Sequence, residues 1–262
     1  MKKKMGKEKG LFLVLLLTLS IMSACGGGGD SSSQSALATQ RIAGIWIGTF
    51  TSNVVSSTFD VTGIIAESGI GRFASTSTGA QYSGVISVNG MGVNGISFSA
   101  TVNAYAPFGE VFPDGSRVGI VGISGAATPR GAMSGTYSGV GDSGTFSLTY
   151  SGLYERPSSL SSVAGTWSGI VSSGDNNTIT VDSSGNITGS STSGCIYSGN
   201  VGIIDPFYNA YSVNLSLNNN CGFGSGNYNG FAALTDTSIP NDTLLIEVSN
   251  PSFSFVASLR RQ

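Results

Sequence analysis

The chain has 262 residues, a formal net charge of −2 and no histidine. All five lysines lie in its first nine residues, so from Cys25 onward seven arginines stand against 13 acidic residues. An acidic chain without a basic patch excludes nucleic acid as a partner. Without histidine the chain lacks the commonest general base and metal ligand. We expect no enzymatic activity, no cofactor and no metal site.

Residues 1–24 have the pattern of a secretory signal, with a basic start, the apolar run Leu11–Met22 and two small residues. The run is shorter than the roughly 20 apolar residues that a membrane-spanning helix needs. The segment Met22–Cys25 resembles the lipobox of bacterial lipoproteins. This resemblance implies that Cys25 becomes the lipidated N-terminus. In such lipoproteins an aspartate after the cysteine implies retention in the inner membrane. Gly26 stands there instead, so the resemblance implies the outer membrane.

Residues 25–40 consist almost entirely of glycine and small polar residues. Such a segment buries too little apolar surface to fold, so it predicts a disordered tether with a coil span on the order of 20 Å. The chain after it is acidic, and we expect no electrostatic docking onto anionic lipid.

The two tryptophans of the chain occupy the same local sequence, Ala-Gly-x-Trp, at Gly44–Trp46 and Gly165–Trp167, 121 residues apart. Tyr82 and Tyr137 have counterparts at Tyr197 and Tyr228 within similar short motifs. Internal repeats of this kind set the fold prediction. We interpret them as a tandem duplication with units at residues 41–156 and 157–262.

Apolar and polar residues alternate with a period of two in many short segments separated by turn residues, which is typical of β-strands. In the second unit each of four segments has one apolar face: Ile179 and Val181; Tyr211, Val213, Leu215 and Leu217; Leu244, Ile246 and Val248; and Phe253, Phe255, Ala257 and Leu259. We expect an all-β fold with about eight strands per unit, in two antiparallel up-and-down barrels. The large inward residues favour a filled second barrel, whereas the first unit is richer in glycine and alanine.

A Gly-x-Trp on the first strand of such a meander resembles the calycin superfamily of lipocalins, fatty-acid-binding proteins and avidins. The resemblance implies that Trp46 and Trp167 close one end of their barrels. It also implies that a basic residue after the last strand stacks on each tryptophan, with Arg156 and Arg260 as the candidates. Barrels on a glycine-rich lipidated tether are also similar to neisserial-type surface lipoproteins.

Cys195 and Cys221 form an even pair in an exported chain, which predicts a disulfide bond. It would close a loop of about 25 residues and contribute about 3 kcal/mol. The alternative, a reactive thiol pair, has no CxxC spacing to support it.

The best candidate for binding is the segment 104–117, which carries Tyr105, Phe108 and Phe112 among proline, glycine and acidic residues. Exposed aromatic residues on loops are typical of interaction sites. The alternative is a lid folded over a barrel mouth. In the second unit its nearest match is Asp205–Tyr208.

Together these features predict a lipid-anchored, non-enzymatic envelope protein that serves as a surface binding or adhesion module for an extracellular protein or glycan. Two alternatives remain open. One is a carrier of a small apolar ligand inside a barrel, and the other is a structural spacer on the envelope.

Overall fold

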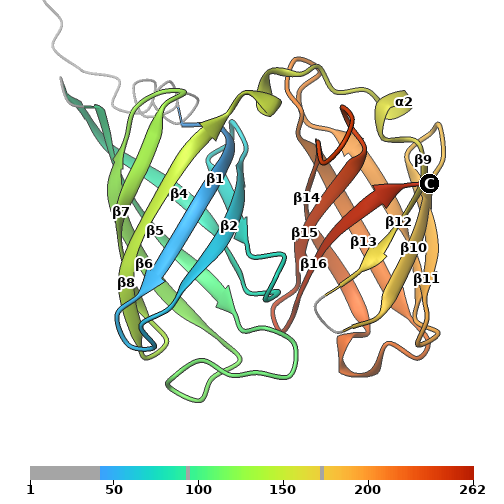
Figure 1. The fold of residues 1–262 in the computed structure, drawn as a ribbon, viewed down its shortest axis with the longest axis horizontal. Coiled ribbons are helices and arrows are strands. Elements are labelled where there is room, and N and C mark those ends of the chain that lie inside the picture. The colour runs from blue at the N-terminus through green and yellow to red at the C-terminus, as the bar shows by residue number, and fades with distance from the viewer. Residues whose placement is uncertain (1–41, 93–94, 172–173) are drawn as a thin grey trace, which may run out of the picture. The chain divides into compact units, whose positions relative to one another are not determined.

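The computed structural model describes residues 42–92, 95–171 and 174–262, which belong to one compact unit. The predicted signal, Cys25 and the tether lie outside the described residues. Within the described ranges, strands form two closed antiparallel barrels in tandem, each with eight strands hydrogen-bonded in chain order (Figure 1). The predicted all-β fold and its up-and-down topology are confirmed.

The strands of barrel 1 are β1 (Gly44–Ser52), β2 (Thr58–Ile65), β3 (Ile70–Ala74), β4 (Gln81–Gly92), β5 (Gly95–Tyr105), β6 (Val118–Ala127), β7 (Ala132–Gly139) and β8 (Asp142–Ser151). The strands of barrel 2 are β9 (Gly165–Ile170), β10 (Asn176–Val181), β11 (Asn186–Ser191), β12 (Ile196–Ile203), β13 (Tyr211–Asn218), β14 (Gly226–Thr235), β15 (Thr243–Ser249) and β16 (Ser254–Arg261). Short helices are η1 (Gly152–Glu155) and α2 (Leu160–Val163) between the barrels, and η2 (Gly222–Gly224). In the described part of the chain no helix is long and apolar enough to cross a membrane.

Alternate residues of each strand fill the barrel interiors. In β13 the four residues predicted to share a face, from Tyr211 to Leu217, are all buried, while Asn214 between them is exposed. Trp46 and Trp167 are fully buried in their respective cores.

Strand β15 is buried at all seven positions, because its outer face packs against barrel 1. Leu245 of β15 and Phe231 of β14 join an apolar cluster with Ile45 and Ile64 of barrel 1. A strand covered on both faces needs apolar residues on both. This contact explains why Leu244, Leu245 and Ile246 break the alternation seen elsewhere.

The same contact encloses two buried ionisable side chains, Arg72 and Glu247. Arg72 of β3 donates hydrogen bonds to Ser249 Oγ at 2.7 Å and to Asn229 Oδ1 at 3.1 Å. Glu247 of β15 is fully buried, and neither of its carboxylate oxygens has a hydrogen-bond partner among the described residues. Burial raises the pKa of the Glu247 carboxyl well above its ordinary value, against the opposing effect of Arg72.

Each barrel has a tryptophan end, where its first strand begins, and a mouth end, where that strand ends. The linker 152–164 joins the two tryptophan ends. Its Tyr154 donates to Glu67 of barrel 1 at 3.3 Å and accepts, at its carbonyl, the Asn209 N–H of barrel 2 at 2.9 Å. Both tryptophan ends therefore lie on the same side of the molecule, at the top of Figure 1.

Candidate ligand-binding site

The same device closes the tryptophan end of both barrels. The indole Nε1 of Trp46 donates to the Ile42 carbonyl at 2.9 Å, and that of Trp167 donates to the Val163 carbonyl at 2.9 Å. Each bond ties the segment before the first strand across the barrel end. The interior of either barrel is thus closed on this side, and any opening lies at the mouth end.

A different group covers each indole. The Arg261 guanidinium lies 4.1 Å from the Trp167 ring centroid and donates to the carbonyls of Ala164 at 2.7 Å and Ser162 at 2.6 Å. The expectation of Arg260 in this role is wrong by one residue. Both arginines are exposed at the end of β16, but side chains alternate along the strand, so Arg260 points outward while Arg261 lies on the face that carries Leu259 and Ala257.

Arg156 is also not the covering group of barrel 1. Tyr150 packs edge-on against Trp46, with ring centroids 5.5 Å apart. Arg156 instead forms an ion pair with Asp236 of barrel 2 at 2.5 Å. The strand register explains why Tyr150 takes this place in barrel 1, because Tyr150 pairs with Trp46 as Arg261 pairs with Trp167.

The glycines of the Gly-x-Trp motif make room for these groups. A Cβ atom at Gly44 would lie 2.5 Å from the Tyr150 ring, and one at Gly165 would lie 2.7 Å from the Arg261 guanidinium. Real Cβ atoms essentially never come this close to another atom. In the Gly-x-Trp motif, the tryptophan therefore closes the barrel end, and the glycine leaves space for the side chain that covers the indole.

A cavity with a volume of about 360 Å³ lies at the mouth end of barrel 2. Six aromatic residues from both barrels line it: Tyr105, Phe108, Tyr197, Tyr228, Phe253 and Phe255. Small-molecule sites are commonly concave, mainly apolar and about 300–1,000 Å³ in volume. The cavity has the size and lining of such a site.

The predicted binding loop contributes directly to this cavity, but only in part. Tyr105 and Phe108 line it. Phe108 is 74% exposed, while Tyr105 is buried. Phe112 does not line the cavity, because it packs against the core of barrel 1. The segment 104–117 thus lies beside the mouth of the other barrel, which the repeat pattern did not predict.

The inward residues of the second barrel form a packed core, as expected, and the cavity lies at the mouth above them. In barrel 1, the Phe50 ring stacks on Tyr82, Tyr137 and Phe146 with centroids 5.4 to 5.5 Å apart. This stack fills the mouth half of the barrel, whose interior void is only about 10 Å³. Barrel 1 is therefore filled up to its mouth end.

Barrel 2 has a smaller residue at the equivalent position. Phe50 lies four residues after Trp46, and four residues after Trp167 stands Val171, which lines the cavity. Tyr197 and Tyr228, the counterparts of Tyr82 and Tyr137, line it as well. Val171 packs against the core of barrel 2 and has a smaller side chain than the central phenylalanine of barrel 1.

The seam that closes barrel 2 is also shorter. In barrel 1, β1 pairs with β8 at eight positions. In barrel 2, β9 pairs with β16 at two positions, Arg260–Ser168 and Arg261–Trp167, both at the tryptophan end. Strand β9 ends at Ile170, whereas β1 extends to Ser52.

Polar side chains at the rim are bonded to one another. The Asp175 carboxylate accepts from Ser193 Oγ at 3.0 Å and from Thr192 Oγ1 at 3.2 Å. The Tyr197 hydroxyl donates to Asn177, which is buried. These bonds hold the rim in one arrangement, and a preformed rim is a feature that lowers the entropic cost of binding in ligand sites.

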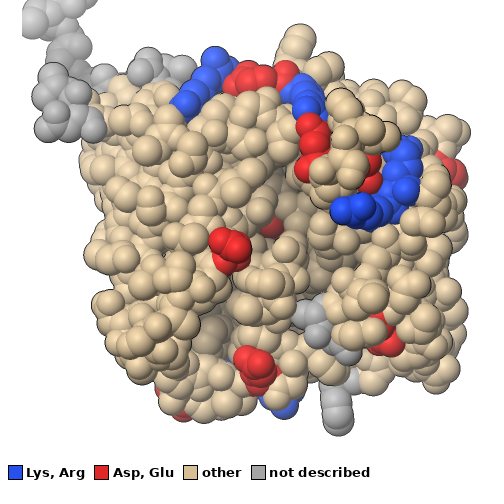
Figure 2. Space-filling model, viewed as in Figure 1, with Lys and Arg blue, Asp and Glu red and all other residues tan. Residues whose placement is uncertain are grey.

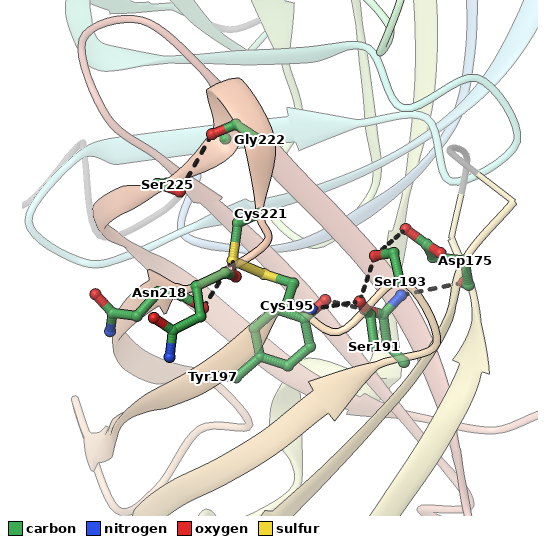
Figure 3. The surroundings of a disulfide bond; sticks show 12 residues. Asp175, Ser191, Ser193, Cys195, Tyr197, Asn218, Cys221, Gly222 and Ser225 are labelled. Atoms are coloured by element: carbon green, nitrogen blue, oxygen red, sulfur yellow. Dashed lines mark hydrogen bonds between the residues drawn. A yellow bond between two sulfur atoms is a disulfide. The ribbon is translucent and has the colours of Figure 1, made fainter.

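The disulfide bond reinforces this rim. Cys195 and Cys221 are joined, with Cα atoms 4.5 Å apart, in the pairing that the sequence predicts. Figure 3 shows the bond beside Tyr197, with the network from Ser191 to Asp175 next to it. It links the turn before β12 to the loop after β13, and both segments line the cavity.

The hydroxyls of Tyr197 and Tyr228 stay uncharged near neutral pH. Desolvation raises the pKa of Tyr197 and of Tyr228 above the ordinary value of 10.0. Tyr228 donates to the Gly224 carbonyl at 2.6 Å. The cavity therefore offers neutral aromatic walls, with the charges of Glu110, Arg117 and Asp175 among its lining residues.

Among the described residues no group of three or more histidine, cysteine or acidic side chains is placed to hold a metal ion. Comparisons with protein-family models, curated proteins and solved structures find no match to this chain. Function must therefore be argued from the site itself.

Proposed function

We propose that this protein is a lipid-anchored, non-enzymatic binding protein of the cell envelope that takes a small, mainly apolar ligand into the mouth of barrel 2. The observation that carries the proposal is the cavity of about 360 Å³ lined by six aromatic residues. Its tyrosine hydroxyls and rim amides supply a few polar contacts, which suits a ligand with an apolar body and one hydrogen-bonding end.

The anchor is proposed from the sequence. The signal pattern of residues 1–24, the lipobox-like Met22–Cys25 and Gly26 support export, lipidation at Cys25 and residence in the outer membrane. Several acyl chains on one cysteine would anchor the protein stably, since a single chain gives only marginal membrane binding.

The residues near the cavity favour binding over catalysis. The chain has no histidine and no lysine after Lys9, so a serine at the rim has no such base to activate it. The Asp175 carboxylate already accepts bonds from two rim hydroxyls. These groups are arranged to hold the rim in shape.

Titration with the neutral apolar fluorophore N-phenyl-1-naphthylamine tests the binding site, using protein from Gly26 onward so that no lipid or detergent competes. We expect saturable fluorescence enhancement that Val171→Phe abolishes, because the new ring occupies the cavity. Ile170→Phe is the matched control: it adds a ring at the neighbouring position, which is 73% exposed. Equal binding by all three proteins would contradict the site.

The loop contribution has its own matched pair. Phe108→Ala should weaken probe binding about threefold to tenfold through lost apolar contact. Phe207→Ala removes an equally exposed ring, 75% against 74%, at the tryptophan end, and should leave binding unchanged. If no small probe binds but a protein or glycan is retained in a Phe108-dependent way, surface adhesion replaces ligand carriage as the function.

The anchor is tested separately by Cys25→Ser, which should yield soluble or unprocessed protein and abolish labelling by radioactive palmitate. Unchanged membrane fractionation of this variant would contradict lipidation at Cys25.

A further inference from the structure

We propose that the tryptophan end of the molecule docks onto the lipid surface by inserting two fixed apolar tips, Phe207 and Ile239. This orientation points the mouth of barrel 2 away from the membrane. The inference rests on the proposed lipid anchor at Cys25 and adds to it a second, non-covalent membrane contact.

The position of the chain entry supports this orientation. Ile42 is the first described residue, and it lies at the tryptophan end, where its carbonyl accepts the Trp46 indole bond. Only residues 26–41 separate it from Cys25. A coil of that length spans on the order of 20 Å. The end of the molecule nearest the anchor is therefore the end that carries the two tips.

Phe207 projects from a turn whose other residues are held by hydrogen bonds and by aromatic stacking. Its N–H donates to Asp205 Oδ1 at 2.8 Å, and Ser158 Oγ donates to the Asp205 carbonyl at 2.8 Å. Next to it, Tyr208 stacks on Tyr154 with centroids 4.7 Å apart. Yet the Phe207 ring is 75% exposed. The turn therefore presents an apolar ring to solvent, and most of that ring makes no packing contact with the protein.

Ile239 projects from a similarly fixed loop between β14 and β15. The Asp242 carboxylate accepts the N–H groups of Thr237 at 2.7 Å, Ser238 at 2.8 Å and Ile239 at 3.2 Å. Desolvation opposes ionisation of Asp242, but these bonds outweigh it and hold its pKa well below the usual range. The Ile239 side chain is nevertheless 64% exposed.

The two loops flank the same linker. Ser158 bonds to the Phe207 turn, and Arg156 pairs with Asp236 at the base of the Ile239 loop at 2.5 Å. Ile203 and Ile204, which lead into the Phe207 turn, are 40% and 39% exposed. Apolar side chains on two fixed loops of one end match the way interfacial segments bury apolar groups about 5–10 Å into a bilayer.

Charge at this end favours insertion over electrostatic attraction. Arg130 pairs with Glu155 and Arg156 with Asp236. In Figure 2 side chains of both signs gather at the upper end of the view, without a uniformly basic face. The expected partner is thus the bilayer interface itself, independent of lipid charge.

Intrinsic tryptophan fluorescence tests the docking in the full-length lipidated protein, reconstituted into phosphatidylcholine vesicles with and without brominated acyl chains. Trp46 and Trp167 are fully buried, so the wild-type protein gives the baseline. A Phe207→Trp variant should shift its emission to the blue, and bromine should reduce the added signal by about half or more. Phe108→Trp, at the mouth end, is the matched control and should show neither effect.

The outcomes separate docking from anchoring. Co-sedimentation with vesicles reports the anchor, and quenching reports the docking. Sedimentation with equal quenching at both positions would overturn the docking and leave the anchor intact. Failure to sediment would contradict the anchor and, with it, the docking. Quenching that requires added phosphatidylglycerol would also contradict the proposed docking, because apolar insertion does not need anionic lipid.

Discussion

Barrel 1 and barrel 2 share topology and the closure of the tryptophan end but differ at the mouth end. Barrel 1 is filled by the stack around Phe50 and sealed by eight paired positions. Barrel 2 has Val171 at the equivalent place, a seam of two paired positions and a cavity of about 360 Å³. The comparison indicates that the two barrels differ in how their mouths are built, and that a loop of barrel 1 lines the cavity at the mouth of barrel 2.

The largest expected effect tests whether Phe50 fills barrel 1. Phe50→Ala should lower the free energy of unfolding by about 3–5 kcal/mol, since it removes the centre of a closed aromatic stack. Val171→Ala, the matched change in barrel 2, should cost about 1 kcal/mol, because its side chain already borders a void. Urea denaturation of both variants measures the difference, and equal losses would break the comparison.

The next effect concerns the disulfide, which only barrel 2 has. Replacing Cys195 and Cys221 together by serine should cost about 3 kcal/mol. Hydrogen exchange should rise in the turn before β12 and the loop after β13, and the apolar probe should bind more weakly. Exchange that rises equally in barrel 1 would show that the bond does not act locally at the mouth.

A smaller effect separates the two covering groups. Arg261→Ala should cost about 1 kcal/mol, because it removes a cation–π contact and two hydrogen bonds to carbonyls. Arg260→Ala, one residue earlier on the exposed face of β16, should cost about 0–0.5 kcal/mol. Thermal unfolding of the two variants distinguishes them. A larger loss for Arg260 would restore the residue that the calycin resemblance implied.

A further expected effect, measured as a slope with pH and not as a single loss, lies at the contact between the barrels. Burial raises the pKa of Glu247 in the folded state above its unfolded value near 4.5. The associated stability is therefore fully present below the unfolded pKa and is lost as the pH rises toward the folded pKa. When urea midpoints are measured at a series of pH values, the fall in stability should be absent in Glu247→Gln. Glu110→Gln, on an exposed loop, should retain the fall. A wild-type urea midpoint that rises with pH, in a way that Glu247→Gln removes, would contradict a raised pKa for Glu247.

Much of the fold follows from local patterns. Period-two alternation places Tyr211 to Leu217 on one face because a strand has only two faces. The duplicated Gly-x-Trp marks the first strand of each barrel, and the isolated cysteine pair gives the disulfide. Where alternation fails, as in Leu244–Ile246, the reason is a second covered face, which no local pattern reveals.

The candidate site was predictable only in part. The aromatic loop identified Tyr105 and Phe108, but the same reasoning included Phe112, which turns back onto barrel 1. The cavity residues Tyr197, Tyr228 and Phe255 looked like ordinary core. A comparison of the two copies at the fourth residue after each tryptophan would have found the difference between Phe50 and Val171.

The sequence by itself determined the strands, the duplication, the disulfide pair and the expectation of an exported, lipidated N-terminus. Only the tertiary structure decided which barrel has a cavity at its mouth, which residue covers each tryptophan, and that the loop of one barrel lines the mouth of the other. The reason is physical: alternation and capping are local, whereas a cavity depends on the summed volume of side chains from several strands. Its neighbours depend on how two closed barrels pack, and that is encoded in no single segment.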